Sequence, residues 1–459
     1  MRYALRLTHA QHQTLHAHLF PGDGKEAVAL LLCGRRSGTS RHVLVVREIY
    51  LVPHEECRRR AADCVTWPTD AVDPILPDAL KHGYAILKIH SHVIDKRSFS
   101  STDDESDQVF FGSVSSLLDD GFPHGSLVMM PSGEIFGRAI MNGKIAEPVS
   151  SVMVIGDDLV IWGDPTTSGN REFTVRTEQA FGKGTTRMLR GLSVAVVGCS
   201  GTGSFVVEHL ARLGAGKLIL VDPDRVEEKN LNRILNSGKE DAYLASFKVH
   251  ALARPIARMG LDQQVVLMPV NLASAEAILA VAECDVVFGC MDGTEGRHIL
   301  NRLATFYSLP YFDVGVRLEA DGEGGISGIS GAVHYLQPGG SSLLSRGVYS
   351  MDQVEAEGMR RTNPEIYRQQ RGEGYLRGIA EDRPAVITVN AIFASLAVQE
   401  FLARIHPYRN QPNNRYSYVG GNLAEMQIHA EGEGAPCPLL APHVGRGDTR
   451  PILNLAGLS

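Results

Sequence analysis

The sequence predicts an α/β protein of two units, of which the second is built on a mostly parallel sheet. Apolar runs of strand length occupy residues 27–33, 42–52 and 84–90. From residue 193 onward, such runs alternate with helical patterns, which is the order of repeated βαβ units. Between the two regions, the Gly-, Thr- and Ser-rich stretch at 163–170 has the composition of a linker.

The first unit is expected to span residues 1–150. After its three early strands, a helix is predicted over residues 103–118, with Ser101 or Thr102 as the N-cap. Short strands around 127–139 complete the unit.

The second unit is expected to span residues 193–430, preceded by a linker and N-terminal arm over 151–192 and followed by a tail over 431–459. Residues 340–385 are polar and rich in Gly and Arg, which predicts a mobile crossing loop, whereas the apolar run that follows predicts a helix. The tail is rich in Gly and Pro, so we expect no defined structure there. The predicted elements are strand 193–198, helix 203–214, strand 217–222, helix 244–258, strand 264–269, helix 273–282, strand 285–290 and helix 385–405.

Composition limits the classes of function. The chain has 459 residues, enough for two or three domains, and its net charge of −7 argues against a nucleic-acid partner. No apolar run reaches about 18 residues and no signal-peptide core is visible, so neither a membrane partner nor export is expected. The seven cysteines form no Cys-x-x-Cys pair, which indicates reduced thiols and a cytoplasmic location.

Two histidines, His90 and His92, end the third predicted strand. Side chains two apart on a strand point the same way, so both can bind one metal ion, although ordinary strand histidines would look the same. Asp103 could supply a third ligand and leave a position open for water. Glu26, just before a buried strand, suits a general base, and Ser100 could donate a hydrogen bond to an oxyanion.

Taken together, these residues resemble the JAMM (JAB/MPN) metalloprotease family over residues 1–148. That family has a Glu ahead of a strand, then His-Ser/Thr-His-Pro, then Ser-x-x-Asp. The stretches Lys-Glu-Ala-Val and His-Ser-His-Val-Ile-Asp-Lys-Arg-Ser-Phe-Ser-Ser-Thr-Asp match at that spacing, with Val93 in place of proline. The resemblance implies an N-terminal JAB/MPN-like α/β domain with Zn²⁺ on His90, His92 and Asp103, which cleaves at the C-terminus of a small carrier protein.

A glycine-rich turn follows the strand at 193–198. Gly198, Gly201 and Gly203 would let backbone N–H groups and a helix N-terminus approach phosphates. Asp222 ends the next strand, where a carboxylate can bind ribose hydroxyls. By itself, such a turn could also belong to a dehydrogenase.

The following run, Leu-Val-Asp-Pro-Asp-Arg-Val-Glu-Glu-Lys-Asn-Leu-Asn-Arg, resembles the ThiF/MoeB and ubiquitin-activating superfamily over residues 171–430. The resemblance implies a Rossmann-like ThiF adenylation domain that uses ATP and Mg²⁺. It implies that Asp222 binds ribose and Asp292 binds Mg²⁺, and that Arg176 reaches into the partner's site of a homodimer. The family's triphosphate contacts fall on Asn230, Arg233 and Lys248. Two departures from the family pattern are Ser200 for a glycine and Ile234 for a glutamine.

The cysteines depart further from this superfamily. Relatives commonly hold a structural zinc on two Cys-x-x-Cys pairs, but the corresponding positions here are Ser342, Ser345, Cys437 and Leu440, so that zinc is expected to be absent. Activating relatives also carry a thioester cysteine in or near the crossing loop, and residues 340–385 contain none. Cys437, in a tail expected to be flexible, is therefore a candidate nucleophile and equally a remnant of the zinc site.

The two resemblances together imply a fused protease and activating enzyme for a ubiquitin-like protein, with a ubiquitin-conjugating-like enzyme as a further partner. Some bacterial gene sets of this kind act in antiviral defence. One alternative is an adenylyltransferase for a sulfur carrier of thiamin, molybdopterin or cysteine synthesis, with a carrier-trimming protease. Another is a binding module in which one domain is an inactive scaffold. A dehydrogenase is the remaining alternative.

Overall fold

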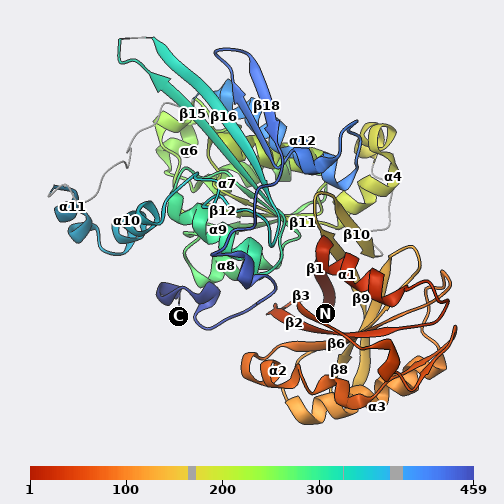
Figure 1. Ribbon diagram of the computed structural model, residues 1–459. Helices are drawn as coiled ribbons and strands as arrows, with labels where there is room; N and C mark the ends of the chain where they lie inside the picture. Colours follow the sequence, from red (N-terminus) through yellow and green to blue (C-terminus); the bar gives the residue numbers. More distant parts are fainter. Residues whose placement is uncertain (164–171, 324, 373–385, 459) are drawn as a thin grey trace.

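The computed structural model describes residues 1–163, 172–323, 325–372 and 386–458. Each of the two units is built around one eight-stranded sheet (Figure 1). The predicted linker at 164–170 lies outside the described residues. The first sheet runs on to Gly163, beyond residue 150, because a long strand turns back through a final hairpin.

The sheet of the first unit is barrel-like. Its strand order is β1-β3-β2-β6-β7-β8-β9-β10, and β1 also pairs with β9, which closes the sheet on itself. Leu87 and Ile89 of β6 point into one core, whereas Lys88 and His90 point to the face that α3 covers. The strands are β1 Arg2–Thr8, β2 Val28–Ser37, β3 Arg41–Leu51, β6 Ala85–Ser91, β7 His124–Met129, β8 Ile135–Met141, β9 Lys144–Ile155 and β10 Leu159–Gly163. The helices are α1 His9–Leu19, α2 Leu76–His82 and α3 Ser101–Leu118, with a small hairpin of β4 Arg59–Arg60 and β5 Val65–Thr66.

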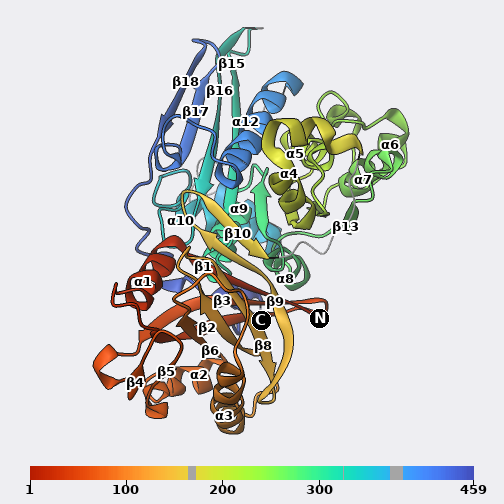
Figure 2. The ribbon, with the colours of Figure 1, turned by 90° about the vertical axis from the view of Figure 1, so that its right-hand side faces the viewer.

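The sheet of the second unit has the order β13-β12-β11-β14-β15-β16-β17-β18. The strands from β13 to β15 are parallel, as predicted, and β15 to β18 are antiparallel. Apolar residues of α5, α7 and α12 pack on one face and those of α8 and α9 on the other (Figure 2). The strands are β11 Ser193–Val197, β12 Lys217–Val221, β13 Gln264–Met268, β14 Val286–Gly289, β15 Tyr311–Ala320, β16 Ile326–Leu336, β17 Tyr418–Asn422 and β18 Gln427–Glu431. The helices are α4 Val175–Gly191, α5 Gly201–Leu213, α6 Lys239–Tyr243, α7 Lys248–Met259, α8 Ala275–Ala282, α9 Thr294–Phe306, α10 Met351–Thr362, α11 Pro364–Gly372 and α12 Ile387–Ile405.

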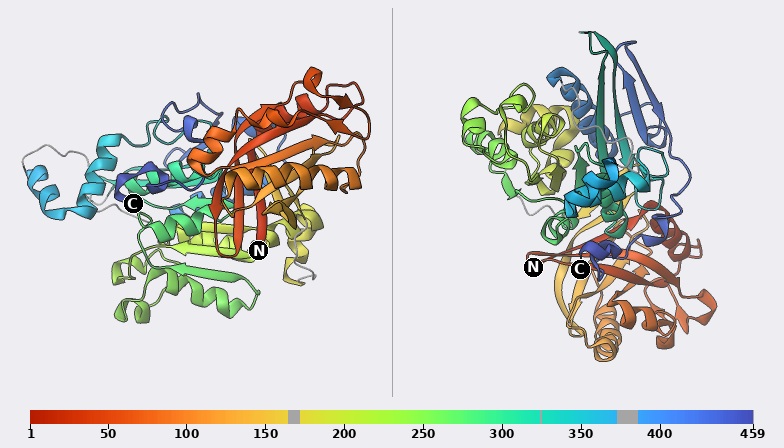
Figure 3. Two further views of the ribbon diagram at one scale, coloured as in Figure 1. Left: turned by 90° about the horizontal axis from the view of Figure 1, so that it is seen from below. Right: turned by 90° about the vertical axis from the view of Figure 1, so that its left-hand side faces the viewer.

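One of the predicted elements is wrong and another begins later than predicted. The stretch expected to be a crossing loop contains α10 and α11, which project from the rest of the unit (Figure 3). The side chains of Ser350 and Gln353 cap the start of α10, a signal that the scarcity of apolar residues hid. Residues 373–385 lie outside the described part. The helix predicted at 244–258 is α7, which begins four residues later, at Lys248, because Ala245 before it has a left-handed φ of 45°.

The C-terminal tail has a defined course, contrary to prediction. It returns to the first unit and lies along β2 (Figure 1). Gly34 N–H donates to the Gly445 carbonyl at 3.1 Å, and Asp448 N–H donates to the Arg35 carbonyl at 2.6 Å. Gly447 bridges to Arg35 as a strand would. Backbone hydrogen bonds to β2 thus order this part of the tail, and farther along it Ile452, Leu453 and Leu455 pack on the core of the second unit.

Arginines of the first unit hold the second unit through the loop that follows α8. Arg41 pairs with Asp285 at 2.6 Å, and Arg36 pairs with Glu283 at 2.7 Å. Arg6 is 1% exposed, and its guanidinium donates to the carbonyls of Ala282, Cys284 and Tyr307. Such buried charges need these partners, so the two units are packed in one fixed arrangement. In the described part of the chain, no helix is both long and apolar enough to span a bilayer.

We expect Gly34→Ala to detach the tail from β2. A Cβ on Gly34 would lie 2.3 Å from the Gly445 carbonyl oxygen and 2.4 Å from the Arg446 carbonyl carbon, and these backbone atoms cannot move cheaply. The expected cost is about 1–3 kcal/mol, measured as a lower unfolding temperature and faster proteolysis within the tail. Gly112→Ala is the matched control, because nothing lies within 4 Å of its Cβ position. Unchanged proteolysis of the Gly34 variant would contradict this account.

Candidate functional sites

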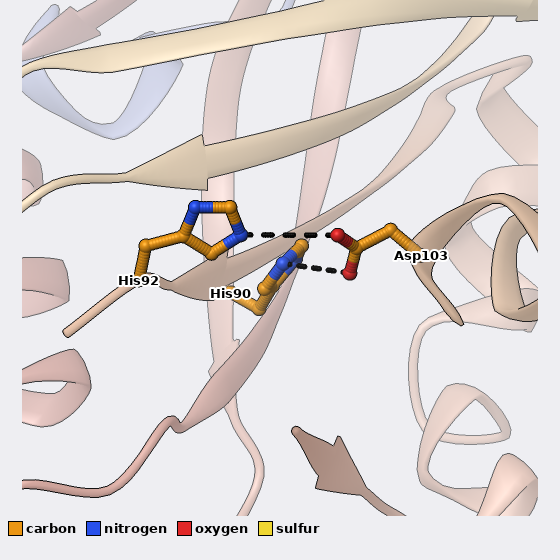
Figure 4. Close-up of side chains that lie close together, drawn as sticks. All are labelled: His90, His92 and Asp103. Carbon is orange, nitrogen blue, oxygen red and sulfur yellow. Dashed lines mark ion pairs between the residues drawn. The ribbon is translucent and has the colours of Figure 1, made fainter. Parts of the chain in front are cut away.

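The structure brings His90, His92 and Asp103 together at the end of β6 and the start of α3 (Figure 4). His90 Nε2 lies 3.0 Å from Asp103 Oδ1, and His92 Nε2 lies 3.8 Å from Asp103 Oδ2. The potential ligand atoms all lie within 4.8 Å of one another. Among the described residues, these three form the only cluster of three or more His, Cys, Asp or Glu side chains that could share a metal ion.

The state of His90 fits a metal ligand. The side chain is buried, and neither ring nitrogen makes a hydrogen bond of good geometry. A buried polar atom without a partner is costly, so an ion there would satisfy an atom that the protein leaves open. Burial also lowers the pKa of His90, which favours the neutral imidazole that binds metals.

Ser100 is the N-cap of α3, so the prediction of Ser101 or Thr102 at that position is wrong. Its Oγ accepts a hydrogen bond from Asp103 N–H at 3.2 Å and donates to Asp103 Oδ2 at 2.8 Å. Ser-x-x-Asp is therefore a capping box that orients a potential ligand. The hydroxyl proton of Ser100 is thus engaged with Asp103. The expected role of Ser100 as a hydrogen-bond donor to an oxyanion stays a prediction.

Glu26 is held beside this cluster by the β4–β5 hairpin. Its N–H donates to the Ala61 carbonyl at 2.8 Å, and its carbonyl accepts from Arg60 Nε at 3.0 Å. The Glu26 side chain is 6% exposed, and burial raises its pKa to about 7. The next residue, Ala27, accepts from Ser91 N–H at 3.0 Å, which places Glu26 beside the strand end that carries the histidines. The charge of His92 lowers the pKa of Glu26 and that of Asp103 raises it.

A buried charge network beneath the cluster was not identified from the sequence. Lys88, two residues before His90, forms an ion pair with Asp107, which lies one helical turn after Asp103. Arg138 of β8 also binds Asp107, with Nη2 at 2.6 Å and Nε at 3.0 Å from Oδ2. The network joins α3 to β6 and β8, and thereby sets Asp103 opposite His90. The i, i+4 aspartates and the alternation of Lys88 with His90 are the signals that could have revealed it.

We expect Asp107→Asn to weaken metal binding without removing a ligand. The substitution leaves Lys88 buried without a countercharge and leaves Arg138 with Asp104 as its remaining partner, which should cost about 3–5 kcal/mol of stability. Loss of a residue that orients a ligand typically lowers metal affinity about 10–100-fold. Chelator competition on folded protein would measure this, with Glu105→Gln, an exposed position on the same helix, as the control. Unchanged affinity in the folded Asp107 variant would contradict the proposed coupling.

The glycine turn lies between β11 and α5, and α5 begins at Gly201, two residues before its predicted start. Gly198 has a φ of +92°, and a Cβ there would lie 2.6 Å from the Cys290 carbonyl oxygen. A Cβ on Gly203 would lie 1.8 Å from the Gly198 carbonyl oxygen. Both positions therefore require glycine, and the N-terminus of α5 points to the carboxyl end of the parallel strands, where ligands of such sheets bind.

Asp222 and Lys248 lie together at this edge. Asp222 is 5% exposed, and its carboxylate accepts from Cys199 N–H at 2.7 Å and from Asp224 N–H at 2.8 Å. Lys248 Nζ lies 2.7 Å from Asp224 Oδ2 and 4.0 Å from Asp222 Oδ1. An anchored carboxylate next to a cation offers an acceptor for hydroxyls and a charge for phosphate.

The structure distributes the remaining predicted residues more widely. Asn230 is buried and accepts from Glu227 N–H at 3.0 Å, whereas Arg233 packs against Gly201 and donates to the Lys229 carbonyl at 2.9 Å. Asp292 is exposed just after β14. Arg176 is exposed on α4 and donates to Gln179.

Cys437 is not in a flexible context, so that expectation is wrong. The residue is 1% exposed, its N–H donates to the Gly340 carbonyl at 3.0 Å, and its carbonyl accepts from Leu440 N–H at 3.2 Å. Nearby, Ser342 and Ser345 hydrogen-bond to each other through their hydroxyls and backbone N–H groups.

Asn390 is a residue that the sequence reasoning missed. It lies on α12, where its Oδ1 accepts from Thr202 Oγ1 at 2.9 Å, while its buried Nδ2 makes no hydrogen bond. A Cβ on Gly201 would lie 2.5 Å from that Nδ2, so the amide faces the glycine turn. An amide among mostly apolar residues near the start of α12 was the available signal.

Comparisons with known proteins concern mainly the second unit. The model of the ThiF family matches residues 175–437. Ubiquitin-like modifier-activating enzyme 5 of Culex quinquefasciatus is 32% identical over 163 residues, which are 33% of this chain and 38% of that protein. The enzyme 5 of Aedes aegypti is 31% identical over 169 residues, 34% of this chain and 40% of its own. The chain thus spans about two fifths of these relatives.

Solved structures are also similar to the chain. Escherichia coli MccB with ATP is 18% identical and covers 59% of this chain and 74% of its own, with a TM-score of 0.44. Selenomethionine PaaA is 19% identical and covers 59% of this chain and 86% of its own, with a TM-score of 0.42.

Proposed function

Because the chain belongs to the ThiF family, we propose that its second unit uses ATP to adenylate the C-terminal carboxylate of a ubiquitin-like protein. The observation that carries this proposal is the glycine turn with Asp222 and Lys248 at the carboxyl ends of β11 and β12. The similarity to ubiquitin-like modifier-activating enzymes favours a protein carrier over a free small acid.

Each residue of this edge has a part in the reaction. The carrier's carboxylate oxygen attacks the α-phosphorus, the bond to the bridging oxygen breaks, and pyrophosphate leaves. Backbone N–H groups at the start of α5 bind phosphate oxygens. Asp222 accepts hydrogen bonds from the ribose hydroxyls, and Lys248 leaves Asp224 to pair with the triphosphate. Asp292 would hold Mg²⁺, which neutralises charge on the triphosphate when bound.

Asn230 and Arg233 are assigned lesser parts. Asn230 shapes the segment before Arg233 by capping it, and Arg233, beside Gly201, reaches the outer phosphates. The amide Nδ2 of Asn390 is available to a phosphate oxygen at the turn.

ATP–pyrophosphate exchange with candidate ubiquitin-like proteins tests the proposal. We expect exchange that needs the carrier, persists in Cys437→Ala, and falls to background in Asp292→Ala. Asp352→Ala, an exposed position on α10, serves as the control. If no carrier supports exchange, the adenylation proposal is wrong.

We further propose that the activated carrier passes directly to the thiol of a ubiquitin-conjugating-like enzyme. The burial of Cys437 favours direct transfer over a thioester on this chain, since a buried thiol cannot meet an acyl adenylate without local unfolding. A thiol-sensitive carrier adduct on a non-reducing gel that disappears in Cys437→Ala would reverse this assignment.

The exposed Arg176, whose contact here is with Gln179, would act in the partner's site of a homodimer. Mixing Arg176→Ala with Asp292→Ala subunits tests that role, because one restored site per dimer would restore exchange.

A second proposed function is a JAMM-type zinc peptidase in the first unit, based on the cluster of His90, His92 and Asp103 beside Glu26. Zinc held by the three would act as a Lewis acid toward water and the scissile carbonyl. Glu26 takes the proton of the attacking water and passes it to the leaving amine. Such a peptidase would mature the carrier's C-terminus or remove the carrier from its targets.

Two other assignments make different predictions for the product. A sulfur-carrier enzyme would yield a carrier whose C-terminal mass corresponds to a thiocarboxylate, whereas a conjugating system would yield carrier joined to another protein. A scaffold role for the first unit would leave carrier processing unaffected by changes to Glu26 or the histidines.

A further inference from the structure

A cavity of about 530 Å³ lies between the two units, away from both candidate sites. The first unit contributes residues of β1, β3, β9 and β10, and the second contributes residues of α4, β11 and β12. Figure 1 shows β10 and α4 at this boundary. Its volume is within the range of small-molecule sites, which occur preferentially between domains.

The charge of this cavity is unbalanced. Arg2, Arg187 and Lys217 line it, and no carboxylate of the described residues lies within ion-pair distance of any of them. The lining carboxylates Glu283 and Asp285 are already paired with Arg36 and Arg41. Asp262, a further lining carboxylate, also has a partner. The exposed Arg2 and Arg187 and the half-buried Lys217 are therefore lining cations without a carboxylate partner among the described residues.

Arg6 adds an independent observation. It lines the cavity from the buried side at 1% exposure, and its Nε makes no hydrogen bond. Its other guanidinium nitrogens donate to the carbonyls of Ala282 and Cys284 at the end of α8 and of Tyr307 after α9. A buried donor without a partner is costly and marks a position where a ligand acceptor would be favourable.

Part of the lining is apolar. Met153 of β9, Ile161 of β10 and Met188 of α4 contribute to it, together with Leu192. The indole of Trp162 faces the core of the first unit instead, because neighbouring strand residues point to opposite sides of a sheet. The two thioethers present polarisable surfaces to a flat ring. The lining thus combines one cationic part with one part suited to an unsaturated apolar group.

We propose that this cavity binds an organic anion of about mononucleotide size that carries a flat apolar ring system. The anionic group pairs with Arg187 and Lys217, and the ring contacts Met153 and Met188. Because both units line the cavity, the ligand stabilises their docking by mass action. The site is separate from adenylation and from proteolysis, and it holds whether or not those activities do.

The test is a fluorescence titration of the full chain with 1-anilinonaphthalene-8-sulfonate, an aromatic sulfonate. We expect one saturable site, weakened about 5–10-fold in Arg187→Gln and in Lys217→Gln. Lys183→Gln is the matched control, since Lys183 is an exposed cation one turn away on α4 that does not line the cavity. Near-ultraviolet circular dichroism of each variant confirms that it is folded.

Two further experiments distinguish dye binding in the cavity from dye binding at the nucleotide site and identify the class of ligand. Asp222→Asn disables the nucleotide turn, so dye binding that survives it belongs to the cavity. Displacement of the dye by AMP identifies a nucleotide as the ligand chemistry, and displacement by 2-naphthoate but not AMP identifies an aromatic acid. Equal binding by wild type, Arg187→Gln and Lys217→Gln, or loss of binding in Asp222→Asn, would overturn the proposal.

Discussion

Glu26→Gln is expected to reduce peptidase activity by about 10²–10⁴-fold while leaving the bound metal in place. The amide cannot accept the proton of the attacking water, although it matches the carboxylate in size. The backbone of Glu26 stays held by Ala61 and Arg60, so the substitution changes the proton acceptor and little else. Burial places the pKa of Glu26 at about 7, where the carboxylate can both take and return a proton near neutral pH.

The measurement is cleavage of a fusion extending the carrier's C-terminus, together with the zinc content of the purified protein. Glu55→Gln, in the nearby turn before the β4–β5 hairpin, is the control. His90→Ala should lose both the bound metal and the activity. Comparing the Glu26 and His90 variants therefore distinguishes a general base from a metal ligand. Full cleavage by a metal-loaded Glu26 variant would remove the residue from the mechanism.

Lys248→Met is expected to lower carrier-dependent ATP–pyrophosphate exchange by about 10²–10³-fold. Methionine keeps most of the apolar stem of the lysine, which is 7% exposed, but removes the charge that meets the triphosphate. The loss also leaves Asp222 and Asp224 without their cation, so repulsion of ATP adds to the effect.

Exchange at saturating ATP separates a loss of rate from a loss of affinity. Lys229→Met, an exposed lysine of the same segment that pairs with Glu227, is the control. Exchange that falls equally in both variants would mean that Lys248 has no special part, and wild-type exchange in the Lys248 variant would place the triphosphate elsewhere.

The parallel strands could be predicted because each is a short, apolar run followed by a turn residue. The glycine turn could also be predicted from the residue types in the sequence, because the close backbone approach at Gly203 admits only glycine. The tail could not be predicted from composition, because its order comes from hydrogen bonds to β2 and from packing of Leu453 on the core of the second unit, both distant in the sequence. Helix α10 was missed for a similar reason, since a capping box and only one buried residue, Ala356, mark it in a polar sequence.

The candidate sites likewise contain residues that local spacing predicts and residues that only tertiary contacts reveal. Residues whose spacing is local, such as His90 and His92, are brought together as the alternation of a strand requires. The N-cap of α3 is Ser100 rather than the predicted Ser101 or Thr102, because helix start signals locate an end only to within a residue or two. Asp107 and Asn390 act through tertiary contacts with Arg138 and Thr202, which no short motif encodes.

The docking of the tail on β2 has a consequence for biosynthesis. Ser37 N–H donates to Asp448, a contact that spans 411 residues. At about 5–20 residues per second, a ribosome needs about 20–80 s to make the intervening chain. During that interval the nascent first unit exposes the edge of β2 that the tail later covers. Trigger-type chaperones or early pausing would therefore influence the yield of complete, docked molecules more than the yield of either sheet.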